Sequence, residues 1–330
     1  MKKRVNWRGW LIALLILIAI AAAVSVLWSR TTVLQEGIID LVCSGNAGVK
    51  PPDYESVLEK VDTLAMDVSY ESRFDNGVLD VYAGKAEELQ PLVVYAHGGY
   101  YCGDDKGDFT YYCQTLASYG YVVANLNYQL APEGRYPTQI LQVNEAIRYL
   151  LAHAAEYGID PARVFIAGDS AGAHLSSQMG LYYTNPAFRE RVGDEPAMEK
   201  EQLRGVVLHC GYYNIETLRA TGFPLIADSV WMMTGEKHYE GTPAAEGMNT
   251  VKQITADYPD VFLDCGDKDP FITQAAEMLS ALAANGIDAT TYLPKTEKFP
   301  LMHEFQVRLN MPEGQEAMER LAGFLEEKGK

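Results

Sequence analysis

The chain begins with a long apolar run. From Trp10 to Trp28 there are 19 residues without a charge and with one polar side chain, Ser25. At about 1.5 Å per residue, a helix of this length spans roughly 28 Å, close to the thickness of a bilayer core. The pattern predicts an N-terminal membrane anchor or signal segment within residues 1–30. A lead-in or stalk is then expected at residues 31–63.

Beyond residue 64, short apolar segments alternate with amphipathic stretches. Residues 64–70 and 78–83 alternate like half-buried strands, and 92–96 is continuously apolar, as in a strand buried on both faces. Further strands are expected at 121–125, 164–167, 205–209, 261–264 and 289–293, with helices at 138–157, 171–183, 272–285 and 313–327. This alternation predicts an α/β fold with a mostly parallel, eight-stranded sheet and helices on both faces. One domain is expected over residues 64–330, with an irregular cap insertion at about 212–258.

Charge is unevenly distributed along the chain. There are 27 Lys+Arg and 44 Asp+Glu, a net charge of −17, but residues 1–30 hold five basic residues and no acid. The remainder is therefore at −22, and a body this acidic repels phosphate backbones, so no nucleic-acid partner is expected. Four of the five basic residues precede the apolar run, which predicts a cytoplasmic N-terminus and an extracytoplasmic body.

The apolar run has a competing interpretation as a cleaved signal peptide. Ala21-Ala22-Ala23 offers an A-x-A-like cleavage site after a shorter apolar stretch. Both interpretations export the body, either attached to the membrane through the N-terminal helix or secreted. The oligomeric state is left open.

Five cysteines cannot all pair within one chain, so a disulfide-built scaffold is excluded. Cys102 and Cys113 are close enough in sequence to bridge in an oxidising compartment, and that pairing is left open. No cysteine or histidine spacing is typical of a metal site. Neither a metal nor another cofactor is expected.

A possible nucleophile lies between a predicted strand and a predicted helix. Gly168-Asp169-Ser170-Ala171-Gly172 has the G-x-S-x-G pattern of a nucleophile elbow, a tight turn that lifts a serine above the sheet. His97-Gly98-Gly99-Tyr100 follows the buried strand 92–96, where glycines can turn backbone N–H groups toward one point. The N–H groups of Gly98, Gly99, Tyr100 and Ala171 are the candidate oxyanion-hole region, with Gly99, Tyr100 and Ala171 as the expected donors.

A serine nucleophile needs a base and an acid that orients the base. With a nucleophile elbow, the triad residues follow one another along the chain in the order Ser, acid, His. The only histidine after the last predicted strand is His303. Asp264, Asp267 and Asp269 follow the strand 261–264, and Asp269 is preferred because it lies farthest into the loop, with Asp267 as the alternative. The predicted catalytic residues are Ser170, Asp269 and His303.

Several ordered motifs together resemble a known family. They are His97-Gly98-Gly99-Tyr100, residues 127–133, residues 157–161, the G-x-S-x-G segment, Asp269-Pro270-Phe271 and His303-Glu304-Phe305. This set resembles the α/β-hydrolase esterases of the hormone-sensitive-lipase type and the related bacterial feruloyl-esterase-like and kynurenine-formamidase-like group. The resemblance covers about residues 64–328. It implies the α/β-hydrolase fold and hydrolysis of a carboxylic ester by a serine.

The expected function is therefore an extracytoplasmic serine carboxylesterase acting on a small-molecule or carbohydrate-linked ester. Export and seven tyrosines within residues 100–128 suggest acetylated or feruloylated polysaccharide as one hypothesis. Two alternatives remain. In the first, the same triad hydrolyses an amide, a formamide or a peptide. In the second, the hydrolase fold binds partners without catalysis.

Overall fold

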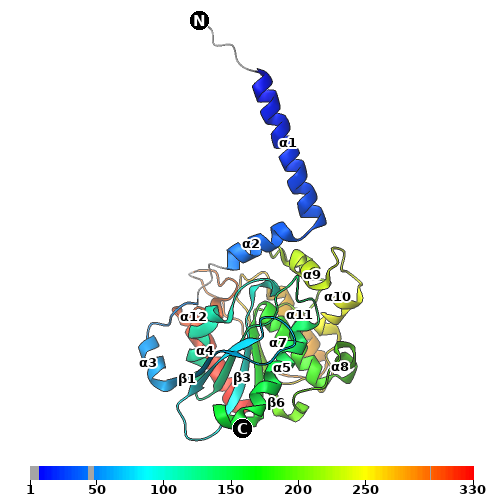
Figure 1. Cartoon of the computed structure of the whole chain (residues 1–330). Helices are drawn as coiled ribbons and strands as arrows, with labels where there is room; N and C mark the ends of the chain where they lie inside the picture. The colour runs from blue at the N-terminus through cyan, green and yellow to red at the C-terminus, as the bar shows by residue number, and fades with distance from the viewer. Residues whose placement is uncertain (1–6, 44–47, 298) are drawn as a thin grey trace.

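One sheet forms the centre of the body (Figure 1). The computed structural model describes residues 7–43, 48–297 and 299–330. In that part of the chain, eight strands pair in the order β1-β2-β4-β3-β5-β6-β7-β8. The β1–β2 and β2–β4 pairs are antiparallel and the other pairs are parallel, which confirms the predicted mostly parallel sheet. The strands are β1 Val61–Ser69, β2 Val78–Gly84, β3 Gln90–Ala96, β4 Val122–Leu126, β5 Ile159–Asp169, β6 Leu203–His209, β7 Val261–Asp264 and β8 Ala289–Tyr292.

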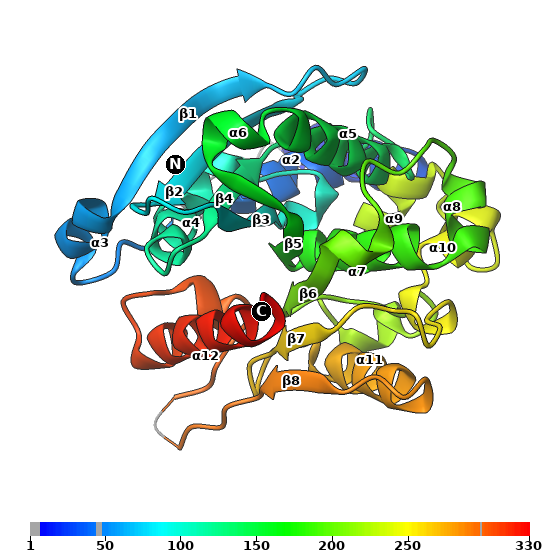
Figure 2. The same ribbon diagram turned by 90° about the horizontal axis from the view of Figure 1, so that it is seen from below.

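Helices cover both faces of the sheet (Figure 2). Along β3, Leu92 and Val94 pack into one apolar cluster with α5, α7 and α11, whereas Val93 and Tyr95 pack into a second cluster with α4 and α12. Burial on both sides explains why this strand has a continuous apolar sequence. The helices of the body are α3 Tyr54–Lys60, α4 Thr110–Ala117, α5 Thr138–Ala152, α6 Ala154–Tyr157, α7 Ala171–Thr184, α8 Pro186–Val192, α9 Ile226–Thr234, α10 Pro243–Gly247, α11 Ile272–Ala284 and α12 Pro312–Lys328.

The apolar pattern predicts most of these elements to within a few residues and misses a few features. The expected helix 138–157 is divided into α5 and α6, because the backbone of His153 leaves the helical region at φ −104° and ψ 17°. β5 begins at Ile159, which pairs with Gln90 of β3, rather than at the predicted residue 164. The pattern does not predict α4, whose buried face includes the polar residues Gln114 and Thr115.

All five cysteines are free and buried. Cys102 lies in the apolar cluster on one face of the sheet and Cys113 in the cluster on the other face. The possible bridge between these two residues is therefore absent from the structure.

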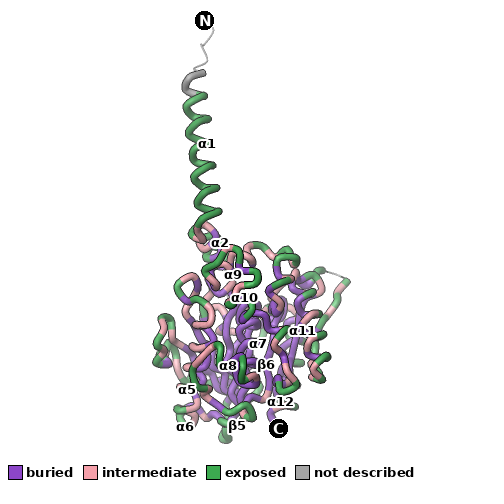
Figure 3. The backbone as a smooth tube through the Cα atoms, turned by 90° about the vertical axis from the view of Figure 1, so that its right-hand side faces the viewer, coloured by how far each residue is buried: buried purple, intermediate pink, exposed green. Residues whose placement is uncertain are grey.

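An N-terminal helix projects from the body (Figures 1 and 3). This helix is α1, Trp7–Arg30, and its segment Trp10–Arg30 has a mean hydropathy of 2.9 with none of it buried, as a membrane span requires. The residues Lys2, Lys3 and Arg4, which carry most of the orientation signal, lie outside the described residues. The next helix, α2 Val33–Cys43, lies along the body.

The insertion between β6 and β7 forms a cap of short helices at the carboxyl ends of the strands. It contains α9 and α10, together with short 3₁₀ turns. Several contacts hold it to α7; among them, the His174 Nε2 atom lies 2.7 Å from the Met248 carbonyl oxygen, and the Ser177 and Thr250 hydroxyls lie 2.8 Å apart.

Candidate active site

Ser170 occupies a strained turn between β5 and α7. Its backbone has φ 50° and ψ −112°, a region that non-glycine residues rarely adopt, and its side chain is 7% exposed. The flanking glycines are required by close backbone approach: a Cβ on Gly168 would lie 2.5 Å from the Ala96 carbonyl oxygen, and one on Gly172 would lie 2.0 Å from it. The packing of this turn against the end of β3 thus fixes the position of the serine hydroxyl.

Three side chains predicted from the sequence come together at this turn. The His303 Nε2 atom lies 2.9 Å from Ser170 Oγ, and His303 Nδ1 lies 2.8 Å from Asp269 Oδ2. The residues come from three separate loops at the carboxyl edge of the sheet. Such a line of nucleophile, imidazole and buried carboxylate has the geometry needed to remove a proton from the serine.

The neighbouring carboxylate controls the basicity of His303. Burial lowers the pKa of the imidazole, but the hydrogen bond and negative charge of Asp269 outweigh burial and hold the pKa above its ordinary value. Asp269 is itself 1% exposed and accepts a hydrogen bond from the Phe271 N–H at 2.8 Å. This second bond keeps the carboxylate oriented toward the histidine.

The competing aspartates have other partners. Asp267 Oδ1 accepts a hydrogen bond from the Leu301 N–H at 3.0 Å, and so supports the loop that carries His303. Asp264 Oδ2 lies 2.8 Å from His209 Nδ1, and the Tyr112 hydroxyl lies 2.7 Å from His209 Nε2. Of these three aspartates, Asp269 is the one that the structure places against His303.

The glycine-rich loop after β3 lies directly beside the serine. A Cβ on Gly98 would lie 3.2 Å from the Cβ of Ser170, and Gly99 and Tyr100 both have positive φ values, 80° and 61°. Ala171 begins α7, where the first N–H groups have no acceptor within the helix. The loop and the start of α7 thus bring the N–H groups of Gly99, Tyr100 and Ala171 to the same side of the sheet as Ser170.

His97 and Tyr128 support the glycine-rich loop. The Tyr128 hydroxyl donates to the carbonyl oxygens of His97 and Gly98, at 2.7 and 3.0 Å. The rings of His97 and Tyr128 stack with their centroids 4.4 Å apart. Burial lowers the pKa of His97 to about 4, so its imidazole is neutral near pH 7. His97 therefore supports the loop, and its Nδ1 atom lies 3.2 Å from the Gly98 carbonyl oxygen.

Aromatic side chains surround His303, and one of them, Phe223, is not singled out by the sequence. The ring of Phe223, from the cap, lies 4.8 Å from the His303 ring, and Phe271 lies 5.2 Å from it. Tyr100 contacts Phe223 at 5.5 Å. The chain gives no local signal for Phe223, because its contact with His303 depends on how the cap folds over the sheet.

A further carboxylate lies beside the histidine. Glu304 has a left-handed backbone, φ 59°, and its Oε1 atom lies 3.7 Å from His303 Nε2. Burial, followed by the charges of Glu304 and Asp108, raises the pKa of Asp104 to about 7. The site is therefore acidic as well as aromatic.

One group of potential metal ligands overlaps the triad. Cys210 Sγ and ligand atoms of Asp269 and His303 lie within 4.8 Å of one another. Burial strongly raises the pKa of the Cys210 thiol, and the Gln306 side chain donates to its sulfur at 2.9 Å. A neutral thiol is a poor metal ligand, and both nitrogens of His303 already have partners. The donor set therefore fits a hydrogen-bonded triad better than a metal centre.

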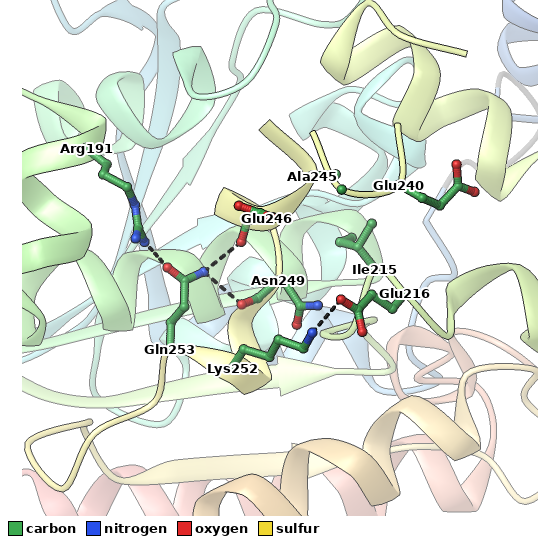
Figure 4. Close-up of a pocket in the computed structure, with 10 residues that line it drawn as sticks. Arg191, Ile215, Glu216, Glu240, Ala245, Glu246, Asn249, Lys252 and Gln253 are labelled. Atoms are coloured by element: carbon green, nitrogen blue, oxygen red, sulfur yellow. Dashed lines mark hydrogen bonds and ion pairs between the residues drawn. The ribbon is translucent and has the colours of Figure 1, made fainter. Parts of the chain in front are cut away.

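A separate pocket of about 270 Å³ opens in the cap (Figure 4). Arg191, Glu216, Asn249, Lys252 and Gln253 line it, with an ion pair between Lys252 and Glu216. No triad residue lines this pocket, so it stands apart from Ser170.

Comparisons with known proteins give a family model and several relatives named as esterases. The sequence profile of the BD-FAE family matches residues 79–282. The chain is 27% identical over 213 residues to "Probable carboxylic ester hydrolase LipM" of Mycobacterium tuberculosis, covering 62% of this chain and 48% of that protein. It is 36% identical over 114 residues to "Carboxylesterase NlhH" of the same organism, covering 34% and 35% of the two chains. The chain thus spans about half or less of the length of these relatives.

Solved structures give the same fold. The crystal structure of Esterase B from Lactobacillus rhamnosis superposes with a TM-score of 0.75 at 24% identity, covering 94% of this chain and 95% of that one. This similarity confirms the predicted α/β-hydrolase fold.

Proposed function

The chain belongs to the BD-FAE family, and from this membership we propose that it is a serine carboxylesterase. The observation that carries the proposal is the continuous hydrogen-bonded line from Ser170 through His303 to Asp269. Relatives named as esterases support the reaction class.

In the proposed mechanism, His303 removes the proton from Ser170 as the serine oxygen attacks the ester carbonyl carbon. The negative charge of Asp269 stabilises the imidazolium that forms. The alcohol then leaves with the proton from His303, and an acyl group remains on Ser170. A water molecule, deprotonated by His303, attacks this acyl-enzyme and releases the carboxylic acid.

The oxyanion of each tetrahedral intermediate is held by the N–H groups of Gly99, Tyr100 and Ala171. One such donor typically contributes about 3 kcal/mol to transition-state stabilisation. The Tyr128 hydroxyl fixes the loop that presents two of these donors. The triad and the oxyanion hole need no cofactor for this chemistry.

The proposed location is extracytoplasmic, with the body attached to the membrane by α1. The length and apolar composition of α1 support an anchor, and the basic residues before it support a cytoplasmic N-terminus. The substrate is proposed to be a small ester or an ester of a larger amphiphile or carbohydrate.

Replacement of the nucleophile tests the proposal. Ser170→Ala is expected to lower p-nitrophenyl acetate hydrolysis by at least about 10³-fold, because no other group replaces the attacking oxygen. Ser176→Ala is a matched control, since Ser176 is a buried serine on α7 with no triad contact. Near-wild-type turnover by Ser170→Ala would overturn the assignment, and faster turnover of matched anilides than esters would indicate an amidase.

A further inference from the structure

Helix α2 has an unusual distribution of side chains for a surface helix. Its buried face consists of Gln35, Ile39 and Cys43, which share one side at a spacing of four residues. The outer face is also apolar: Ile38 is 40%, Leu41 73% and Val42 55% exposed, and these residues, three and four positions apart, lie together on the helix surface. Among the described helices of the body, none other has more than one large exposed apolar residue. A helix with water on its outer side normally places polar residues there.

The acidic residues of α2 do not break the apolar face. Glu36 and Asp40 are four residues apart and therefore lie together on one flank. Burial, followed by the charges of Glu133 and Asp40, raises the pKa of Glu36, which is half-buried, whereas Asp40 is exposed. The surface directed away from the body thus remains apolar.

The position of α2 relative to α1 indicates what covers this surface. Only Thr31 and Thr32 separate the two helices, a distance of at most about 7 Å when extended. The polar layer on each side of a bilayer core is of similar thickness, about 5–7 Å. If α1 spans a membrane, α2 must begin within the headgroup layer.

The junction between these helices is fixed to the body. The Gln35 Nε2 atom donates to the Trp28 carbonyl oxygen at 2.9 Å and to Asp228 of α9 at 3.4 Å. The Lys237 ammonium donates to the Ser29 carbonyl oxygen at 2.6 Å. These bonds tie the end of α1, the start of α2 and the cap together, so the orientation of the body follows that of α1.

The buried face of α2 covers the loop that carries the oxyanion donors. A Cβ on Gly103 would lie 2.9 Å from Cys43 Sγ and 3.6 Å from Ile39 Cγ2, and the Gly103 N–H donates to the Gly99 carbonyl oxygen at 2.8 Å. The loop of His303 is also close, since the charge of Glu304, next to the histidine, contributes to the raised pKa of the Cys43 thiol. The active-site edge and the apolar face of α2 therefore share one side of the molecule, from which α1 emerges (Figures 1 and 3).

We propose that the outer face of α2 inserts into the membrane interface and holds the active-site edge against the bilayer. The substrate is then an ester of a membrane-resident amphiphile that reaches Ser170 from the lipid. This inference rests on the proposed anchor and esterase activity, and it names the lipid surface as the partner of α2.

The direct test is the environment of residue 38 in the full-length protein reconstituted in phosphatidylcholine vesicles. Ile38→Cys, labelled with an environment-sensitive fluorophore, is expected to shift its emission to the blue and to be quenched by spin-labelled phosphatidylcholine. The matched control is Leu89→Cys, which is exposed and directly precedes β3 at the opposite edge of the sheet, and it is expected to do neither. A blue shift without quenching would indicate a second copy or a protein partner, and would overturn the inference.

Catalysis gives the second readout. Ile38→Glu combined with Val42→Glu is expected to lower hydrolysis of p-nitrophenyl palmitate in vesicles by about tenfold or more, because charged residues leave the interface. Hydrolysis of soluble p-nitrophenyl acetate is expected to stay unchanged, as are both rates in Leu89→Glu. Equal loss of both substrates, or of neither, contradicts the inference.

These experiments distinguish failure of the membrane anchor, of the esterase proposal and of the inference about α2. If the wild type does not float with vesicles, the anchor is wrong. If it floats but hydrolyses no ester, the esterase proposal is wrong, while the fluorophore still reports on α2. If it floats and hydrolyses esters but residue 38 stays in water, only the inference about α2 is wrong.

Discussion

At the scale of single residues, Asp267 and Asp269 illustrate how neighbouring carboxylates take different partners. Asp269 faces His303, while Asp267 holds the backbone of Leu301. Chain order and loop position are sufficient to predict Ser170, His303 and a preference for Asp269. They cannot predict Phe223 beside the histidine, because that contact arises only when the cap folds over the sheet.

The two aspartates give a matched pair of variants. Asp269→Asn is expected to lower kcat/KM for ester hydrolysis by about 10³–10⁴-fold, because the amide no longer stabilises the imidazolium. Asp267→Asn keeps an oxygen for the Leu301 N–H and is expected to cost far less. Steady-state kinetics on both variants check this. Similar losses in the two would mean that the acid is assigned to the wrong residue.

The pH dependence follows from the same hydrogen bond. Only neutral His303 acts as the base, and Asp269 holds its pKa above the usual 6.5. We expect kcat/KM to fall as the pH drops through a midpoint above 6.5, since protonation removes the base. In Asp269→Asn, only the charge of Glu304 still opposes the burial of the imidazole, so the residual activity is expected to show a lower midpoint. A wild-type midpoint below 6.5 contradicts this account.

At the scale of elements, the turn between β5 and α7 depends on packing against β3. The sequence predicts this turn because G-x-S-x-G follows an apolar strand and precedes a helix. It does not predict the cap contacts or the position of α2, since these join segments far apart in the chain. The sequence of α2 in particular mixes apolar residues with Gln35, Glu36 and Asp40, and it does not show which side packs on the body.

Two glycine substitutions compare a closely packed position with an open one. Gly172→Ala places a Cβ 2.0 Å from the Ala96 carbonyl oxygen and is expected to destabilise the protein by about 1–3 kcal/mol and to abolish ester hydrolysis. Gly323→Ala, within α12, meets nothing within 4 Å and is expected to stabilise by about 0.5–1 kcal/mol. Urea unfolding of both variants measures the difference. An unaffected Gly172→Ala would show that the turn is looser than described.

At the scale of the whole molecule, an acidic body is joined to an apolar, basic leader. The sequence predicts this division from charge alone, with five basic residues in 1–30 and a net charge of −22 beyond them. Whether the leader remains attached is a matter of processing, which residue patterns do not decide. The body itself relies on apolar clusters on both faces of the sheet, with its five cysteines buried and free.

The free cysteines give a prediction for the intact protein. A reductant is expected to leave the Tm unchanged, whereas loss of a native disulfide typically costs about 2–5 kcal/mol. Thermal unfolding with and without dithiothreitol measures this. A marked fall in Tm on reduction would indicate a bridge between Cys102 and Cys113 or another pair.

The central claim is that Ser170 is a nucleophile activated by His303. The most direct measurement is covalent labelling of the folded protein with a fluorophosphonate, followed by mass spectrometry of its peptides. The account predicts one adduct per chain, on Ser170, with labelling lost in Ser170→Ala and strongly slowed in His303→Ala. An adduct on another residue, or ester hydrolysis that persists without any labelling of Ser170, would contradict it.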